Sequence, residues 1–149
     1  MSKLYLRFVQ KSFKYFFLLF LVLELESSEK VDIKNLLPKL EVASNFEDRK
    51  KGLMFIPSIS DEFGMFFIWE YKKKQCMWMK DTFTPLSVAY IADNGEIIEI
   101  YDMVPFSRKS VCSKKPVKYA LEVNKDWFKK KGLKIGDVLD INRIIKSDN

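Results

Sequence analysis

A short polar segment, Lys80-Asp81-Thr82, carries the side chains of this chain that are best suited to chemistry. Within three residues it offers a cation, a carboxylate and a hydroxyl, close to the aromatic ring of Trp78. If residues 75–79 form a strand, alternate residues share a face, and Trp78 lies on the same side as Cys76 and Lys80. Such a segment could bind a polar ligand against an aromatic wall. Alternatively, Asp81 and Thr82 only form the turn that follows, with their side chains bonded to their own backbone.

The methionines beside this segment predict either a packed core or a soft metal site. The opposite face of the predicted strand holds Met77 and Met79. The thioether is flexible and packs well against aromatic rings, so the plainer interpretation is that both side chains fill the core beside the many Phe residues. The alternative is a site for cuprous copper, built from two thioethers with Cys76 nearby. We predict no other metal site.

The chain contains no histidine, which excludes several kinds of active site. A Ser-His-Asp triad, a Cys-His pair and any His-containing metal site are impossible. Proton transfer near neutral pH would need a carboxylate whose pKa is raised by burial, a lysine whose pKa is lowered by burial, or a thiol. The five glycines are isolated, so there is no glycine-rich phosphate-binding loop. We predict no cofactor.

Residues 1–25 predict export or membrane anchoring. Four basic residues between Lys3 and Lys14 precede an uncharged apolar run, residues 15–23, that closes at Glu24. This pattern is typical of a secretory signal peptide, and the run is too short for an ordinary spanning helix of roughly 20 residues. The small-x-small cleavage pattern is missing, so retention as a short N-terminal membrane anchor is the alternative. We therefore expect a protein that is exported, periplasmic or anchored to the membrane by this segment.

The rest of the chain is long enough for one domain and only mildly basic. The net charge of +6 falls to +3 when the four basic and one acidic residues of residues 1–25 are set aside. Lysine runs at residues 72–74, 114–115 and 129–131 predict solvated surface, or attraction to an anionic membrane surface or an acidic partner. They are not interleaved with aromatic residues as in a nucleic-acid-binding module, so we predict no nucleic acid partner.

The apolar patterns predict a mainly β (α+β) domain over residues 39–146, after a linker at residues 26–38. Strands are expected at residues 39–43, 65–69, 75–79, 87–92, 96–101, 117–123 and 138–144. Asn94-Gly95 predicts a type I′ hairpin turn. A first short helix should begin at Ser44, end at Gly52 and close one end of the core, and Asn124 should cap a second that ends at Gly132. About seven short strands and two short helices favour a small curled or barrel-like sheet.

Short motifs follow one another between residues 40 and 144. They are Gly52-Leu53-Met54, Gly64-Met65-Phe66-Phe67, the run from Trp78 to Thr82, Pro85-Leu86, Leu121-Glu122 and Gly136-Asp137. Their order and spacing resemble domain-of-unknown-function family 192, a family of small bacterial and archaeal domains. The resemblance implies a compact β-barrel-like domain. Asp81 stands where the family more often has Asn, and Ser87 stands where it often has Asp, so an acid at that position is absent here.

The resemblance also singles out a candidate ligand-binding group, whose members are Trp78, Lys80, Asp81, Thr82 and Glu122. The function that we predict is a binding or interaction module for a small polar ligand, an envelope component or a partner protein. The alternative is a hydrolase-like or transferase-like enzyme, with Glu122 or Asp81 as base and Lys80 as electrostatic stabiliser. An interaction module should expose an aromatic patch, whereas a catalytic carboxylate should lie in a cleft with a perturbed pKa.

The two cysteines, Cys76 and Cys112, allow one disulfide in an exported domain. Such a bond would tie the long loop to the preceding strand and contribute roughly 3 to 4 kcal/mol. Two unpaired thiols are the alternative. Family members often carry a cysteine pair within the loop itself, but here Phe106 stands near the place of the partner of Cys112.

Overall fold

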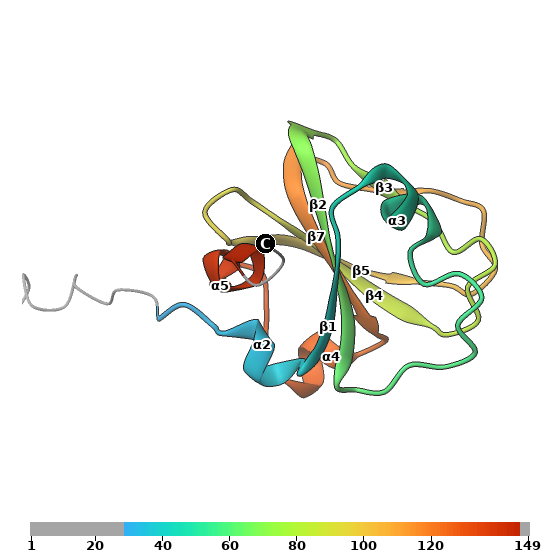
Figure 1. Ribbon diagram of the computed structural model, residues 1–149, viewed down its shortest axis with the longest axis horizontal. Helices are drawn as coiled ribbons and strands as arrows, with labels where there is room; N and C mark the ends of the chain where they lie inside the picture. Colours follow the sequence, from blue (N-terminus) through green and yellow to red (C-terminus); the bar gives the residue numbers. More distant parts are fainter. Residues whose placement is uncertain (1–28, 147–149) are drawn as a thin grey trace, which may run out of the picture.

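A computed structural model describes residues 29–146 of the chain (Figure 1). The predicted export or anchor segment, residues 1–25, lies outside the described residues. The described part has seven strands in two sheets and four short helices, which confirms the mainly β fold class. No helix within residues 29–146 is long and apolar enough to cross a membrane.

The larger sheet is open and has five strands. In chain order the elements are α2 (Ile33–Leu36), β1 (Lys39–Ala43), α3 (Phe46–Lys51), β2 (Phe63–Lys73), β3 (Cys76–Met77), β4 (Leu86–Ile91), β5 (Ile97–Met103), β6 (Val111–Cys112), β7 (Val117–Asn124), α4 (Trp127–Lys130) and α5 (Ile141–Lys146). The strand order is β1-β2-β7-β4-β5, with β1 parallel to β2 and the other pairs antiparallel. Because β1 and β5 remain as edges, the barrel-like closure that we expected does not form. Strands β3 and β6 make a separate ribbon.

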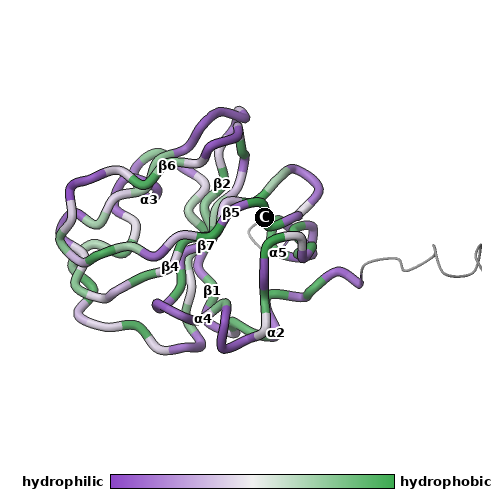
Figure 2. The backbone as a smooth tube through the Cα atoms, turned by 180° about the vertical axis from the view of Figure 1, so that it is seen from behind, coloured by the Kyte–Doolittle hydropathy of each residue, from purple (hydrophilic) through white to green (hydrophobic). Residues whose placement is uncertain are grey.

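Both faces of the sheet are covered by apolar residues. Strand β4 is buried at every position, and β7 is buried everywhere except at Lys118 and Asn124. Figure 2 shows the apolar segments along these central strands and the hydrophilic residues mainly in turns. On one face, residues of α2, α4 and α5 pack on side chains such as Phe66 and Leu121. On the other, Leu53 and residues of the β3–β6 ribbon pack on side chains such as Phe67 and Val88.

One glycine of the sheet is required by close packing. A Cβ atom on Gly64 would lie 2.8 Å from Leu37 Cδ1 and 3.2 Å from the backbone oxygen of Glu122. A side chain at this position of β2 would therefore push α2 away from the sheet. Packing of this kind explains the glycine in the Gly64-Met65-Phe66-Phe67 motif.

The hairpin between β4 and β5 forms, but its turn is not type I′. A type I′ turn needs positive φ at both central residues. Here Gly95 has φ 93°, whereas Asn94 is not among the residues with positive φ. The backbone N–H of Gly95 donates to Ala92, and that of Ala92 donates to Glu96. The longer turn places Gly95 against Leu139, where a Cβ atom would lie 2.2 Å from the Leu139 backbone oxygen.

Both predicted helices form, with different caps. Asn45 rather than Ser44 caps α3, because its side chain accepts the N–H of Asp48 at 2.9 Å. No residue of α3 is buried, so this helix does not close the core as predicted. Helix α4 begins after Asp126, whose side chain makes no capping bond. The amide of Asn124, the predicted cap, donates instead to the backbone oxygen of Ile59.

The two ends of the predicted domain differ from expectation. The predicted strand at residues 138–144 is wrong: Val138 and Leu139 form only isolated bridges, and α5 starts at Ile141. Ile141 and Ile144 are both buried, as one apolar helix face requires. The predicted linker is corrected as well over residues 29–38. It contains α2, which is capped by Asp32, and Ile33 and Leu37 are fully buried.

The β3–β6 ribbon is held by a disulfide. Cys76 and Cys112 are bonded to each other and occupy opposite positions of the ribbon. The Tyr90 hydroxyl of β4 donates to the backbone oxygen of Val111 at 2.6 Å and so fixes the ribbon to the sheet. A pair of strands of two residues each has few hydrogen bonds of its own, so the crosslink matters for its order.

We predict that Cys76→Ser/Cys112→Ser lowers the free energy of unfolding by about 4 kcal/mol. The two cysteines are separated by 36 positions, and the unfolded chain gains the freedom of that loop. Denaturant unfolding of the oxidised proteins measures the difference. Reduced wild type should match the variant, and a loss below about 1 kcal/mol would contradict this account of the ribbon.

Candidate functional site

The predicted segment from Trp78 to Lys80 keeps the expected alternation although only Cys76 and Met77 pair as a strand. Met77 and Met79 are buried, whereas Trp78 is exposed. Lys80 Nζ lies 5.6 Å from the centre of the Trp78 ring, in cation–π contact. It also lies 3.9 Å from the carboxylate of Asp81, and both side chains are too exposed for this pair to contribute much stability.

Thr82 has a structural role in the turn. Its side chain is buried, and its Oγ1 donates to the backbone oxygen of Lys80 at 3.2 Å. Its backbone oxygen accepts the N–H of Phe106, while that of Asp81 accepts the N–H of Phe55. These bonds support the turn interpretation for Thr82, whereas the Asp81 side chain faces Lys80. The segment ties three loops together.

Glu122 lies apart from this segment, in the apolar interior. It sits in the centre of β7, opposite Met65 on one side and Val88 on the other, and is 3% exposed. No hydrogen bond or ion pair within residues 29–146 joins it to Lys80 or Asp81. Burial raises the pKa of Glu122 to about 8. The carboxyl is therefore mainly protonated at neutral pH.

Trp78 lines a groove of about 280 Å³ that the sequence did not reveal. We call it the Trp78 groove, and its lining residues are Phe46, Arg49, Lys50, Trp69, Lys73, Cys76, Met77 and Trp78. Three of these side chains are aromatic, three are cationic and none is acidic. Cys76 and Met77 complete the wall. The candidates that reach this groove are thus Trp78, Cys76 and Met77, while Lys80 contacts it through the Trp78 ring.

Helix α3 positions one wall of the Trp78 groove. The Arg49 guanidinium donates to the backbone oxygen of Ile68 at 2.9 Å and to that of Ser44, which fastens the helix to β2. Lys50 Nζ lies 5.8 Å from the centre of the Phe46 ring, and that ring is 65% exposed. The available sequence signal was the spacing of Phe46 and Lys50, four residues apart in a predicted helix, which brings two side chains onto one helix face.

Strand β2 and the ribbon supply the other walls. The Trp69 ring stacks on Phe67, with ring centres 6.0 Å apart and an interplanar angle of 20°. Phe67 is fully buried, so Trp69 is supported from the core. The disulfide of Cys76 holds Met77 and Trp78 in the wall of the groove that the ribbon supplies. The aromatic surfaces are therefore built on anchored elements.

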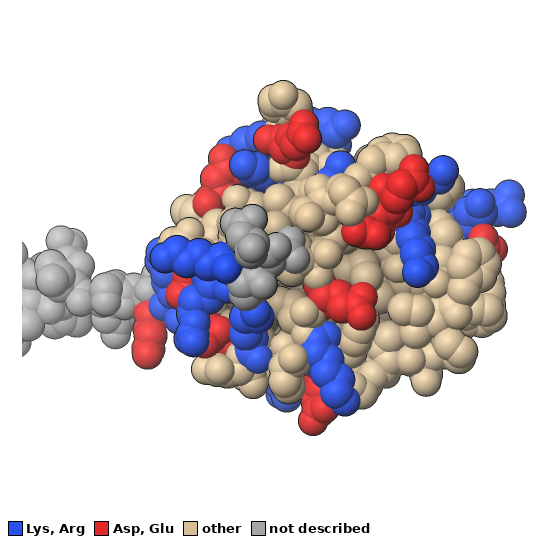
Figure 3. All heavy atoms as spheres, viewed as in Figure 1, with Lys and Arg blue, Asp and Glu red and all other residues tan. Residues whose placement is uncertain are grey.

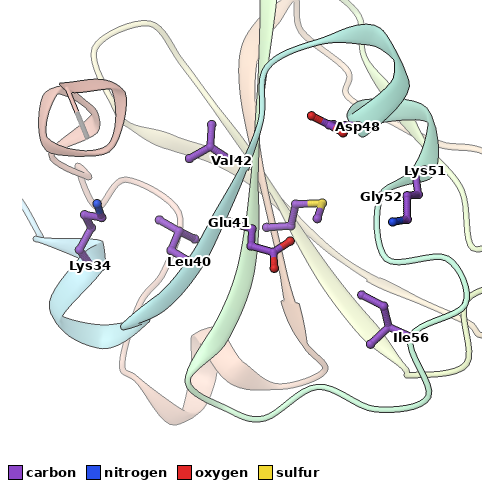
Figure 4. Close-up of a pocket in the computed structure, with 9 residues that line it drawn as sticks. Lys34, Leu40, Glu41, Val42, Asp48, Lys51, Gly52 and Ile56 are labelled. Carbon is purple, nitrogen blue, oxygen red and sulfur yellow. The ribbon is translucent and has the colours of Figure 1, made fainter. Parts of the chain in front are cut away.

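A second cavity, of about 420 Å³, lies between β1, α3 and the loop after α3 (Figure 4). Figure 4 shows Glu41 of β1 and Ile56 of the loop on opposite sides of it. Its charged lining residues are Lys34, Glu41, Asp48 and Lys51, so the two signs are balanced. It contains no aromatic side chain. Unlike this cavity, the Trp78 groove has a clear preference for one class of ligand.

The sulfur atoms of the predicted soft metal site take part in the fold. The Cys76 sulfur is bonded to Cys112 and offers no thiolate. Met77 and Met79 belong to the buried cluster that also contains Met65 and Met103. In the described part of the chain, no group of three or more Cys, Asp or Glu residues could hold a metal ion.

The chain belongs to domain-of-unknown-function family 192, described as "Uncharacterized ACR", which matches residues 28–141. The match includes all the motifs that suggested the resemblance. No curated protein matches the chain.

Two solved structures are similar in fold. One is from Sinorhizobium meliloti 1021 and is described as a putative transcription regulator; it is 35% identical, with a TM-score of 0.65, over 66% of this chain and 78% of that one. The other, a protein of unknown function from Novosphingobium aromaticivorans DSM 12444, is 28% identical, with a TM-score of 0.64, over 66% of this chain and 71% of that one. Neither description assigns a ligand.

We predict that Glu122→Gln removes a pH dependence of stability. In the wild type the folded-state pKa, about 8, exceeds the ordinary value of 4.5. The stabilising effect of protonated Glu122 is therefore fully present below pH 4.5 and is lost as the pH rises toward 8. Over that window the loss is on the order of 4 kcal/mol. Denaturant melts across this pH range should show that the free energy of unfolding of the variant rises relative to that of the wild type as the pH rises. A difference that stays constant with pH would contradict the raised pKa.

Proposed function

We propose that this protein is an exported binding module that takes an anionic ligand with a flat or apolar face in the Trp78 groove. The single observation that carries the proposal is the groove lining, which combines three aromatic rings with three cations and no carboxylate. This pairing suits carboxylated or phosphorylated glycans of the cell envelope. Such ligands offer an apolar sugar face for stacking and charges for the lysines.

The charges of the groove are available to a ligand. Arg49 donates to backbone oxygens, and Lys50 contacts the Phe46 ring. In the described part of the chain, none of Arg49, Lys50 and Lys73 forms an ion pair. A ligand charge would therefore replace water rather than an existing acidic partner. Partial enclosure by aromatic walls strengthens such an interaction relative to open solvent.

A binding role has more support than catalysis. The groove holds neither a carboxylate nor a histidine that could transfer a proton near neutral pH. Glu122, whose pKa is raised, lines neither the groove nor the cavity beside β1. Lys80 is engaged with Trp78 and Asp81. Of the two proposed bases only Asp81 lies beside Lys80, and neither Asp81 nor Lys80 lines the groove or the cavity beside β1.

Export agrees with the disulfide. Disulfides persist mainly in oxidising compartments, and the Cys76–Cys112 bond lies at the surface. The basic and apolar pattern of residues 1–25 supports the same location. The description of the Sinorhizobium meliloti protein as a transcription regulator raises nucleic acid as an alternative, since cationic and aromatic grooves also suit single strands. Export would separate this chain from such a ligand.

Calorimetric titration tests the ligand class. A galacturonate hexamer should bind, whereas a neutral glucose hexamer of equal length should bind at least about tenfold more weakly, because it lacks the charge. Trp78→Ala and Lys50→Gln/Lys73→Gln should each weaken binding of the galacturonate by about tenfold or more. Tighter binding of a thymidine oligonucleotide than of galacturonate would favour the nucleic acid alternative.

The matched control removes equal charge elsewhere. Lys129→Gln/Lys131→Gln lies on and after α4, outside the groove, and should leave binding of the galacturonate within about twofold. Equal losses in both double variants would show that only net charge matters. That result would contradict a site in the Trp78 groove.

Location has its own test. A reporter that is active only outside the cytoplasm, fused after Asn149, should be active when residues 1–25 are present and inactive when they are deleted. Recovery of the full-length chain as soluble cytoplasmic protein would contradict export.

A further inference from the structure

Three loops meet at one end of the sheet, and their exposed apolar residues do not line the Trp78 groove. The N–H of Phe55 donates to the backbone oxygen of Asp81 at 2.9 Å, and the N–H of Phe106 donates to that of Thr82 at 3.2 Å. The rings of Phe83 and Phe106 touch edge to face, with centres 5.2 Å apart. These loops expose four large apolar side chains, which we call the loop patch: Phe55, Phe83, Val104 and Phe106.

Two of these side chains sit on backbone that disfavours them. Phe55 has φ 66° and Phe106 has φ 62°, in the left-handed region that suits glycine and is rare for bulky residues. The two side chains are 66% and 58% exposed, so little core burial compensates for this conformation. Strain of this kind concentrates at functional positions. Their exposure leaves both rings accessible to a partner.

The charge around the loop patch is sparse and basic. Residues 53–60 contain no charged side chain, and the nearby acidic residues Asp81 and Asp102 are paired with Lys80 and Lys125. Arg108 and Lys109, just after Phe106, are exposed and form no ion pair within residues 29–146. Figure 3 shows a broad uncharged area on the lower right of the molecule, on the side where Figure 1 places these loops. The loop patch therefore has an apolar centre and a basic border.

We propose that the loop patch docks on an anionic lipid bilayer, with its rings among the headgroups and Arg108 and Lys109 at the lipid phosphates. The four apolar side chains line neither the groove nor the cavity beside β1, and they project from loops. A bilayer interface accepts such projecting side chains without a shaped partner, and anionic lipid attracts the basic border. This surface is independent of the Trp78 groove.

Glycine variants test the docking without unfolding the protein. Phe55→Gly/Phe106→Gly removes both rings and places glycine where φ is positive, so the melting temperature should stay equal or rise. With the full chain, partitioning onto vesicles of equal parts phosphatidylcholine and phosphatidylglycerol should fall at least about tenfold. Arg108→Gln/Lys109→Gln should reduce partitioning onto these vesicles more than onto pure phosphatidylcholine.

The control is Ile135→Ser, which changes an apolar side chain that is 58% exposed and lies outside the loop patch. It should partition like the wild type within about twofold. Residues 1–25 are common to all variants, so a measurement at single residues is needed to separate membrane binding by that segment from binding by the loop patch. In NMR spectra, a spin-labelled lipid should broaden the amide signals of Phe55, Phe83 and Phe106 but not that of Ile135. Unchanged partitioning of the glycine variant, or broadening elsewhere, overturns the proposal. Loss of self-association or protein capture in that variant, with vesicle binding unchanged, assigns the patch to a protein interface and overturns it as well.

Discussion

Burial of the central strands on both faces is the constraint on which the structure depends. Strands β4 and β7 are mainly apolar and are buried at consecutive positions, so neither face of the sheet can be left to water. On one face the cover comes from α2, α4 and α5, the last two of which follow the final strand. On the other it comes from loops and the disulfide-bonded ribbon. The outer surfaces of this second cover carry the groove and the loop patch.

Glu122 shows what the constraint costs. Its position on β7 places it in a row across the sheet with Glu41, Met65 and Val88. Glu41 is at the exposed edge, whereas Glu122 is in the centre and has no opposite charge beside it. Burial without a partner keeps its carboxyl protonated rather than ionised. Glu122 of the Leu121-Glu122 motif therefore occupies an interior position, apart from the other members of the predicted ligand-binding group.

Much of the fold could be predicted from local patterns. The first strand was expected at residues 39–43, where β1 lies. Alternation in residues 117–123 located β7, although alternation indicates one buried face and this strand is buried on both. The strand prediction for residues 138–144 was wrong because a short apolar run fits a strand or a helix. Only the packing of Ile141 and Ile144 decides between the two. The linker prediction failed for a similar reason. Ile33 and Leu37 are too few to show a period.

The site was less accessible to sequence reasoning. Trp78 and Lys80 were predicted beside one another, and they are in contact. The three aromatic residues of the groove come from different elements: Phe46 from α3, Trp69 from β2 and Trp78 from the segment after β3. No local spacing in the sequence predicts that they line one groove. The positive φ of Phe55 and Phe106 could not be predicted from the sequence either. Both residues donate backbone hydrogen bonds to another loop, Phe55 to Asp81 and Phe106 to Thr82. Sites assembled from distant segments need the fold first.

The tryptophan indole N–H signals in a two-dimensional NMR titration test the central claim most directly. Of the three tryptophans, Trp69 and Trp78 line the groove, whereas Trp127 is buried and donates its indole N–H to the backbone oxygen of Asp61 at 2.8 Å. Adding a galacturonate hexamer should shift the Trp69 and Trp78 signals together and leave that of Trp127 in place. No shift at saturating ligand, or shifts confined to residues around Glu41 and Lys51, would contradict an anion-binding Trp78 groove.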